Sequence, residues 1–281
     1  MVKSIGILGV PAEDLRITDH PEWGTMSRTV YLPGITDALR KEIIPHLRQR
    51  EVYAEDLGEL ELGEPYPLAT IKNPKFLSYW GNYLKRENIR FLDVADGSFE
   101  SNREKIQVLS KEYGLLVLIG PSHLGAIFLY GGGDVVCRMD YHADYSDQGL
   151  RTIPNYATYL NWVENNLKNI EVYNLFVCEN KHLFGRSADS TILPQSTNHL
   201  DIDIDCLGGT DRLIDKKVYP ETDGPAKATK REVLGIAGTL DIDKLGIWEY
   251  RPEYDPSLKG HCRGGLEFIT NLIMAAAKGR G

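Results

Sequence analysis

The sequence predicts an α/β fold of three layers, αβα, in which helices cover both faces of a mostly parallel central sheet. Short apolar runs, typical of strands buried on both faces, alternate along the chain with amphipathic segments of helical periodicity. Strands that alternate with helices form parallel sheets, because each crossover helix packs on one face of the sheet. In such folds, sites form at the carboxyl ends of the strands.

The apolar runs give the expected strands. They lie at residues 5–10, 115–119, 172–178 and 246–250, and two further runs, 135–139 and 199–200, lead into clusters of acidic residues. Helices are expected after Thr36, around 106–113 and 159–167, and from about 265 to 278. Pro45 is expected to kink or divide the first of these helices, because proline lacks the amide donor that a helix interior needs.

Length and charge narrow the class of protein. With 281 residues and 42% hydrophobic content, the chain can bury a large core. A net charge of −8 argues against nucleic acid or an anionic membrane as the main partner and favours a small cationic or neutral substrate. The four cysteines contain no CxxC pair, which argues against a zinc ribbon or thioredoxin chemistry. Without a signal-peptide pattern or a long apolar run, the protein is expected to be cytoplasmic.

Two acidic clusters place charged side chains at every second position. Asp140, His142 and Asp144 form the first, and the run from Asp201 through Asp203 to Asp205 forms the second. In a strand alternate side chains share a face, so each cluster is expected to project its charged groups in one direction. Because both clusters follow apolar strands, both are expected at the same rim of the sheet.

Such crowding of carboxylates calls for cations. Two carboxylates about 4 Å apart repel each other by roughly 4 kcal/mol at an effective dielectric constant near 20. Two divalent ions would balance the four charges of Asp140, Asp144, Asp203 and Asp205, and oxygen-rich ligands with a little nitrogen favour manganese over zinc or copper. His123, which follows the strand at 115–119, is a candidate second imidazole. The alternatives are a solvated acidic strand edge and a structural role for His123.

The cluster Asp140-Tyr141-His142-Ala143-Asp144 resembles the DxHxD motif of the ureohydrolases, the family of arginase, agmatinase and formimidoylglutamase. Three more segments are similar to family motifs and follow in the family's order. Ser122-His123 resembles the end of GGDH, Asp203-Ile204-Asp205 the DxD of SxDxDxxDP, and the segment 249–255 the ExxPxxD motif. The resemblance implies an arginase-like fold and a single ureohydrolase-like domain over residues 1–281.

The resemblance also implies a site with two Mn²⁺ ions per chain. One ion would be held by His123, Asp140, Asp144 and Asp203, and the other by His142, Asp140, Asp203 and Asp205. A hydroxide that bridges the metals would be the nucleophile, and Asp144 would orient it and carry its proton to the leaving amine. Glu249 would face the substrate cation; the alternative is a core acid paired with Arg251. Asp201 is expected outside the ligand set.

Several positions depart from the family pattern. Serine at position 122 replaces the acid of GGDH, so the residue that would orient His123 by a hydrogen bond is not identified. Asp201 stands where a serine is usual. Tyr156 lies where arginases and agmatinases carry a histidine for proton transfer. Arg151 is a candidate for binding a substrate carboxylate, and an exposed loop arginine is the alternative. Formimidoylglutamases also lack that histidine, so arginase is the least favoured activity.

These observations predict a binuclear manganese hydrolase of the agmatinase or formimidoylglutamase type, which cleaves a non-peptide C–N bond in a linear amidine or guanidine. Its partner would be a small cationic substrate. One alternative is a homologue that retains the metals and binds a ligand without catalysis, and another is a deacetylase-like enzyme with one zinc. A homo-oligomer, trimer or hexamer, is expected by analogy with the family.

Overall fold

The structure is a computed structural model that describes the following residues: 4–20, 24–31, 34, 36–61, 90–91, 97–145, 159–177, 184–187, 193–194, 196–208, 228–250 and 264–279. No described helix has both the length and the hydropathy to cross a membrane. The expected helices and strands are recovered, although the helix expected around 106–113 begins at Gly97 and the strand expected over 172–178 ends at Leu175.

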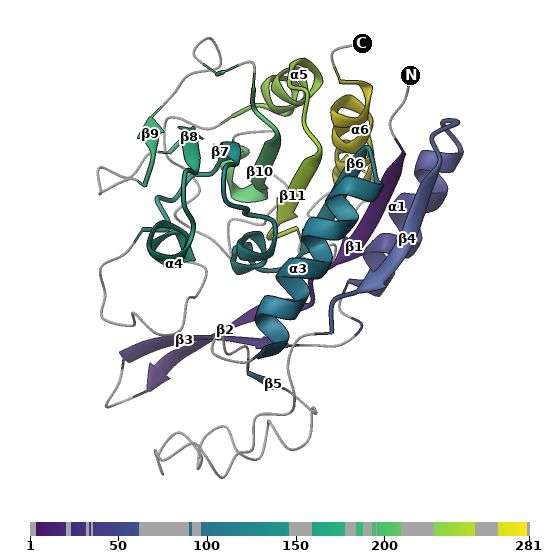
Figure 1. Ribbon diagram of the computed structural model, residues 1–281. Coiled ribbons are helices and arrows are strands. Elements are labelled where there is room, and N and C mark those ends of the chain that lie inside the picture. The colour runs from purple at the N-terminus through teal and green to yellow at the C-terminus, as the bar shows by residue number, and fades with distance from the viewer. Residues whose placement is uncertain are drawn as a thin grey trace.

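An eight-stranded sheet forms the centre of the described structure (Figure 1), with the order β4-β1-β6-β11-β10-β7-β8-β9. Every neighbouring pair in it is parallel. The strands are β1 (Ile5–Gly9), β4 (Ala54–Glu59), β6 (Leu115–Gly120), β7 (Val135–Met139), β8 (Glu171–Leu175), β9 (Arg186–Ser187), β10 (His199–Asp203) and β11 (Lys244–Trp248). The expected parallel sheet is confirmed.

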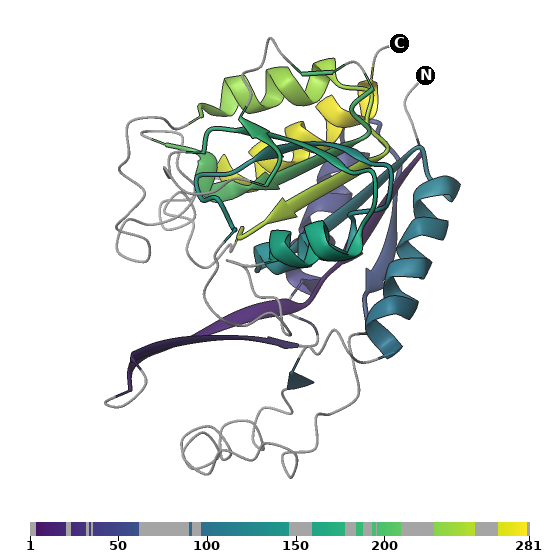
Figure 2. The same cartoon turned by 60° about the vertical axis from the view of Figure 1, so that its left-hand side comes forward.

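Helices cover both faces of this sheet (Figure 2). The first layer comprises α1 (Asp37–Arg48), α5 (Lys230–Thr239) and α6 (Gly264–Lys278), and the second comprises α3 (Gly97–Glu112), α4 (Tyr159–Asn166) and the 3₁₀ helix η2 (His123–Phe128). Strand β6 shows the division: Leu115, Val117 and Ile119 join the core of the first layer, and Leu116 and Leu118 that of the second. The three-layer αβα fold is therefore confirmed.

A second, antiparallel sheet was not expected from the sequence. Strands β2 (Ala12–His20) and β3 (Gly24–Tyr31) form a long ribbon that extends from the body of the molecule, and β5 (Arg90–Phe91) pairs with β3 (Figures 1 and 2). The segment 12–31 is rich in polar residues. It lacks the continuous apolar run by which strands buried on both faces are recognised.

The structure contradicts a division of the first helix at Pro45 and the expected start of the strand at 246–250. Helix α1 runs through Pro45 as one element, because the proline lies in the last turn, where Ile44 and Leu47 are buried in the core. Strand β11 begins at Lys244, two residues before the expected start. Lys244 is buried, and its Nζ donates to the carbonyl oxygen of Leu129 at 3.2 Å.

Candidate metal centre

Four adjacent strands bring the predicted site residues to one edge of the sheet. His123 begins η2 just after β6, Asp140 follows β7, Asp203 ends β10 and Glu249 follows β11. The register aligns these ends, because Asp203 lies beside Trp248 and Ile202 lies beside Met139. The parallel sheet therefore gathers side chains from positions as far apart as 123 and 249.

The loop after β7 reaches this site in a way that differs from the expectation. Asp140, His142 and Asp144 do not alternate along a strand, because β7 ends at Met139. The backbone amide of His142 donates to Asp140 Oδ1 at 2.6 Å, and Asp144 adopts a left-handed backbone with φ of 46°. A non-glycine residue in this region is uncommon and costs about 1 kcal/mol or more, so the surrounding structure must hold it.

The second acidic cluster uses the same local device. Asp203 Oδ1 accepts a hydrogen bond from the backbone amide of Asp205 at 2.9 Å, at the start of the short 3₁₀ helix η3 (Ile204–Cys206). In each cluster one aspartate, Asp140 or Asp203, fixes the residue two positions later, which is a common turn-forming role of aspartate. From Asp140 to Asp144 and from Asp203 to Asp205, turns therefore replace the expected strand alternation, whereas Asp201 and Asp203 do lie two positions apart in β10.

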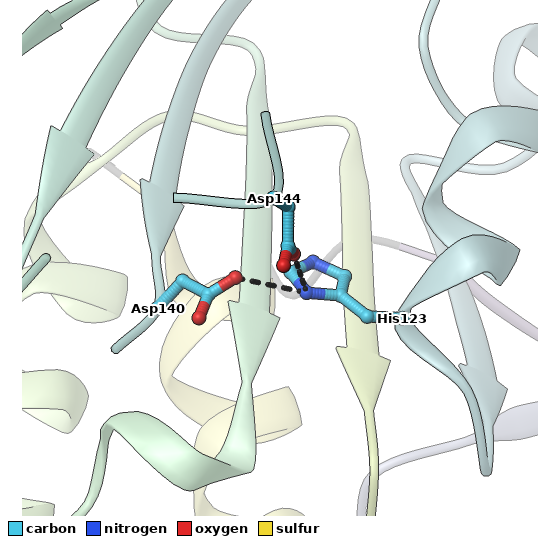
Figure 3. A group of neighbouring side chains, drawn as sticks. All are labelled: His123, Asp140 and Asp144. Carbon is cyan, nitrogen blue, oxygen red and sulfur yellow. Dashed lines mark ion pairs between the residues drawn. The ribbon is translucent and has the colours of Figure 1, made fainter. Parts of the chain in front are cut away.

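The ring nitrogen Nδ1 of His123 faces three carboxylates, and Figure 3 shows two of them, those of Asp140 and Asp144. It lies 2.9 Å from Asp140 Oδ2, 2.9 Å from Asp144 Oδ2 and 3.1 Å from Asp203 Oδ2. Within the described part of the chain, this buried nitrogen has no partner with hydrogen-bond geometry. Neighbouring ligands of an octahedral ion with bonds of about 2.1 Å lie about 3 Å apart. His123, Asp140 and Asp144, whose ligand atoms all lie within 4.8 Å of one another, therefore fit a divalent ion, and Asp203 lies next to this group.

A second group lies beside the first. His142 Nδ1 is 2.7 Å from Asp205 Oδ2 and 3.9 Å from Asp140 Oδ1. Asp140, His142 and Asp205 each offer a ligand atom within 4.8 Å of the others, and so do Asp203, Asp205 and Glu249. Asp140 thus presents Oδ2 to His123 and Oδ1 toward His142. A carboxylate placed in this way is suited to bridge two ions.

The two groups differ in their access to solvent. The side chains of His123, Asp140 and Asp203 are at most 3% exposed, whereas that of His142 is 29% exposed. Glu249 is half-buried at the end of β11 and has a left-handed backbone with φ of 61°. The centre therefore opens to solvent on the side of His142 and Glu249, where a small molecule could approach.

Without metal, protons must offset the crowded negative charge. Burial and then the nearby Asp205 raise the pKa of Asp203 to about 6. Burial, the largest single effect, lowers the pKa of His142, but the hydrogen bond to Asp205 and the charges of the neighbouring aspartates together raise that pKa to about 11. Burial also raises the pKa of Asp140 well above its usual range. Metal ions that bind here must displace these protons.

Comparison with known structures supports this arrangement of elements. No protein-family model and no curated protein sequence matches the chain. Its structure is similar to formimidoylglutamase from Bacillus subtilis, with a TM-score of 0.60, 13% identity, and 100% of this chain and 89% of that one covered. The chain has the arginase-like fold. It is likewise similar to arginase from Bacillus caldovelox, with a TM-score of 0.58, 17% identity and 99% of each chain covered. Proclavaminate amidino hydrolase from Streptomyces clavuligerus gives a TM-score of 0.58 and 14% identity, with 99% of this chain and 93% of that one covered.

Within this arginase-like fold, the structure brings together all six predicted metal ligands: His123, Asp140, His142, Asp144, Asp203 and Asp205. Glu249 lies beside them. Two predicted substrate-binding residues, Tyr156 and Arg151, fall outside the described residues, as does Arg251, the alternative partner of Glu249. Their predicted roles remain predictions.

A buried arginine beside the ligands was missed by the sequence analysis. Arg138, in the middle of β7, is fully buried. Its Nη2 donates to Asp144 Oδ2 at 2.8 Å and also to Asp140 Oδ2, and its Nε donates to the Tyr159 hydroxyl at 3.0 Å. Burial is the largest single effect and opposes ionisation of Asp144, but Arg138 and His123 together outweigh it and lower the pKa of that carboxyl. A charged residue inside the apolar run 135–139, two positions before Asp140, was the available signal.

The stability of the metal-free arginase-like fold is predicted to fall as pH rises from about 4 to about 6. In this window the folded Asp203 keeps a proton that the unfolded chain, with a pKa of 3.8, has lost. The native state then binds more protons, so the free energy of unfolding decreases with pH; Asp203 contributes on the order of 3 kcal/mol, and Asp140, whose pKa is also raised, acts in the same direction. His142 does not change the free energy of unfolding in this window, because its imidazole is protonated in both the folded and the unfolded chain below about pH 6.5.

Chemical denaturation from pH 4 to pH 7, with a chelator and with Mn²⁺, measures this slope. With Mn²⁺ the stability should instead increase with pH, because the ion competes better as the ligands lose protons. Equal slopes under the two conditions would contradict the assignment of these acids to a metal centre.

Proposed function

We propose that this chain is a binuclear manganese hydrolase that cleaves a non-peptide C–N bond in a linear amidine or guanidine, of the agmatinase or formimidoylglutamase type. One observation carries the proposal. Two candidate ligand groups, one around His123 and one around His142, share Asp140. The proposal includes one domain over residues 1–281, a cytoplasmic location and a trimeric or hexameric assembly.

The chemistry of the donor atoms supports manganese. The site offers four carboxylates and two imidazoles, and hard, oxygen-rich sites suit manganese or magnesium better than zinc or copper. Four carboxylates exceed what one zinc ion needs, which argues against the single-zinc alternative. When bound, two such ions would supply an activated water as the nucleophile.

The chain's own residues would bind the substrate and move the proton. Glu249 stands at the solvent side of the centre, and a carboxylate there suits a planar amidinium or guanidinium through paired, charge-assisted hydrogen bonds. Arg138 keeps Asp144 ionised, so this carboxylate can accept a proton and deliver it to the leaving amine. The charge of Glu249, which lies beside the metal ligands, favours a cationic substrate over a neutral one.

An assay of the Mn²⁺-loaded protein tests the proposal. Agmatine, formimidoylglutamate, arginine, guanidinobutyrate and guanidine would be supplied in turn, and release of urea, formamide or ammonia measured. We expect turnover of at least one amidine or guanidine, lost with a chelator and restored by Mn²⁺, with arginine among the poorest substrates. Metal binding and ligand-induced thermal stabilisation without product would favour the non-catalytic alternative instead.

A further inference from the structure

A fully buried carboxylate lies behind His123, on the side away from the candidate metal ligands. Asp201 is completely shielded from solvent in β10. Its Oδ1 accepts a hydrogen bond from Trp248 Nε1 at 2.6 Å, and its Oδ2 accepts one from the Tyr130 hydroxyl at 2.7 Å. A buried charge with several well-placed donors is costly to assemble, so its surroundings indicate a specific role.

Asp201 contacts the second ring nitrogen of His123. Nε2 lies 3.3 Å from Asp201 Oδ2 and 3.0 Å from the Tyr159 hydroxyl, which itself donates to Asp201 Oδ2 at 3.2 Å. When Nε2 carries the proton, the lone pair of Nδ1 faces Asp140, Asp144 and Asp203. Metal-binding histidines commonly donate their other ring N–H to a carboxylate, which fixes the tautomer and the ring orientation.

Position 122 does not supply this support. The family motif has an acid immediately before the histidine, and this chain has Ser122. The Ser122 hydroxyl accepts a hydrogen bond from the backbone amide of Leu124 at 3.2 Å, as the N-cap of η2. The carboxylate nearest to Nε2 instead comes from β10, at the position where the motif usually has a serine.

The negative charge of Asp201 lies near the positive charge of a buried arginine, Arg138. Arg138 is its neighbour across β7 and β10, and the Tyr159 hydroxyl joins the two, since it accepts from Arg138 Nε and donates to Asp201. The buried cluster thus contains five carboxylates, of Asp140, Asp144, Asp201, Asp203 and Asp205, and one guanidinium. One positive charge against five negative charges leaves four, the number that two divalent ions balance.

We propose that Asp201 is the positioning residue of His123, and that it replaces the support that serine at position 122 cannot give. The inference rests on the proposed metal centre. It predicts that loss of the Asp201 carboxylate weakens the ion held by His123 more than the ion held by His142, because only the first imidazole contacts Asp201.

The test compares Asp201→Asn with the unaltered protein. Metal content and the affinity of each Mn²⁺ would be measured by titration, and electron paramagnetic resonance would separate a coupled pair from an isolated ion. We expect the ion held by His123 to lose affinity by about 10- to 100-fold, with the signal of an isolated Mn²⁺ at limiting metal. Tyr130→Phe, which removes one hydrogen bond to Asp201, should shift the same ion by less.

Asp134→Asn is the matched control. Asp134 is another buried acid, bound to Lys244 at the opposite end of β7, and its loss should lower stability without changing either metal affinity. Unchanged binding of both ions by Asp201→Asn and Tyr130→Phe would overturn the inference, as would an equal loss of both ions. If the unaltered protein itself bound no Mn²⁺, the proposed function would fail first, so the two failures are distinguishable.

Discussion

Asp203→Ala is expected to remove both metal ions and to reduce turnover by at least about a hundredfold. Asp203 Oδ2 is 3.1 Å from His123 Nδ1, and Asp203 also shares a ligand group with Asp205 and Glu249. It therefore stands between the two candidate positions. Its side chain is buried, so no other described carboxylate can move into its place without a change in the sheet.

Metal analysis and a kinetic assay of the purified variant would measure this effect. Asp241→Ala is the control, because Asp241 is exposed in the turn before β11 and lies outside the candidate ligand groups. It should keep both ions and full turnover. If Asp203→Ala retained two ions, the proposal that Asp203 bridges them would be contradicted.

Glu249→Gln is expected to keep both ions and to lower kcat/KM by about 10- to 100-fold. A hydrogen bond to a charged partner contributes roughly 1.5–3 kcal/mol, and the amide of glutamine loses the charge that attracts an amidinium. The effect should appear mainly in KM if Glu249 only binds the substrate. Steady-state kinetics together with metal analysis would separate these contributions.

The alternative role for Glu249 is that of a metal ligand. Glu249 offers a carboxylate oxygen within 4.8 Å of ligand atoms of Asp203 and Asp205. If Glu249→Gln lost an ion, Glu249 would be a ligand and our separation of metal binding from substrate binding would be wrong. Glu104→Gln, on the exposed face of α3, is the matched control and should change neither quantity.

The apolar runs predicted the central sheet because buried parallel strands leave a strong local signal. The expected strand before Asp140 is β7, and the run before His123 is β6. The rule that sites form at the carboxyl ends of such strands then brought His123, Asp140 and Asp203 together. For these residues, local pattern and sheet topology were sufficient.

The sequence did not reveal the turns and the buried polar network. The left-handed backbone of Asp144 depends on contacts that sequence spacing does not encode. Arg138 and Asp201 support each other through Tyr159, a residue from a separate helix, so neither position is interpretable alone. Lys244 shows the same difficulty, because a buried lysine is recognised only when its partners are known.

The fold alone does not establish the chemistry. Related architectures can host different reactions, so the case for hydrolysis depends on the side chains at the centre. Here the carboxylates, the two imidazoles and the half-buried Glu249 form one continuous site at the ends of β6, β7, β10 and β11. Arg138 and Asp201 give that site a surrounding charge pattern that departs from the family motifs.

The most direct test of the central claim is an anomalous-scattering map from crystals of the Mn²⁺-loaded protein. We predict two peaks about 3.5 Å apart, one beside His123 and one beside His142, with Asp140 and Asp203 between them. No peak, or a single peak at another place in the molecule, would contradict the account.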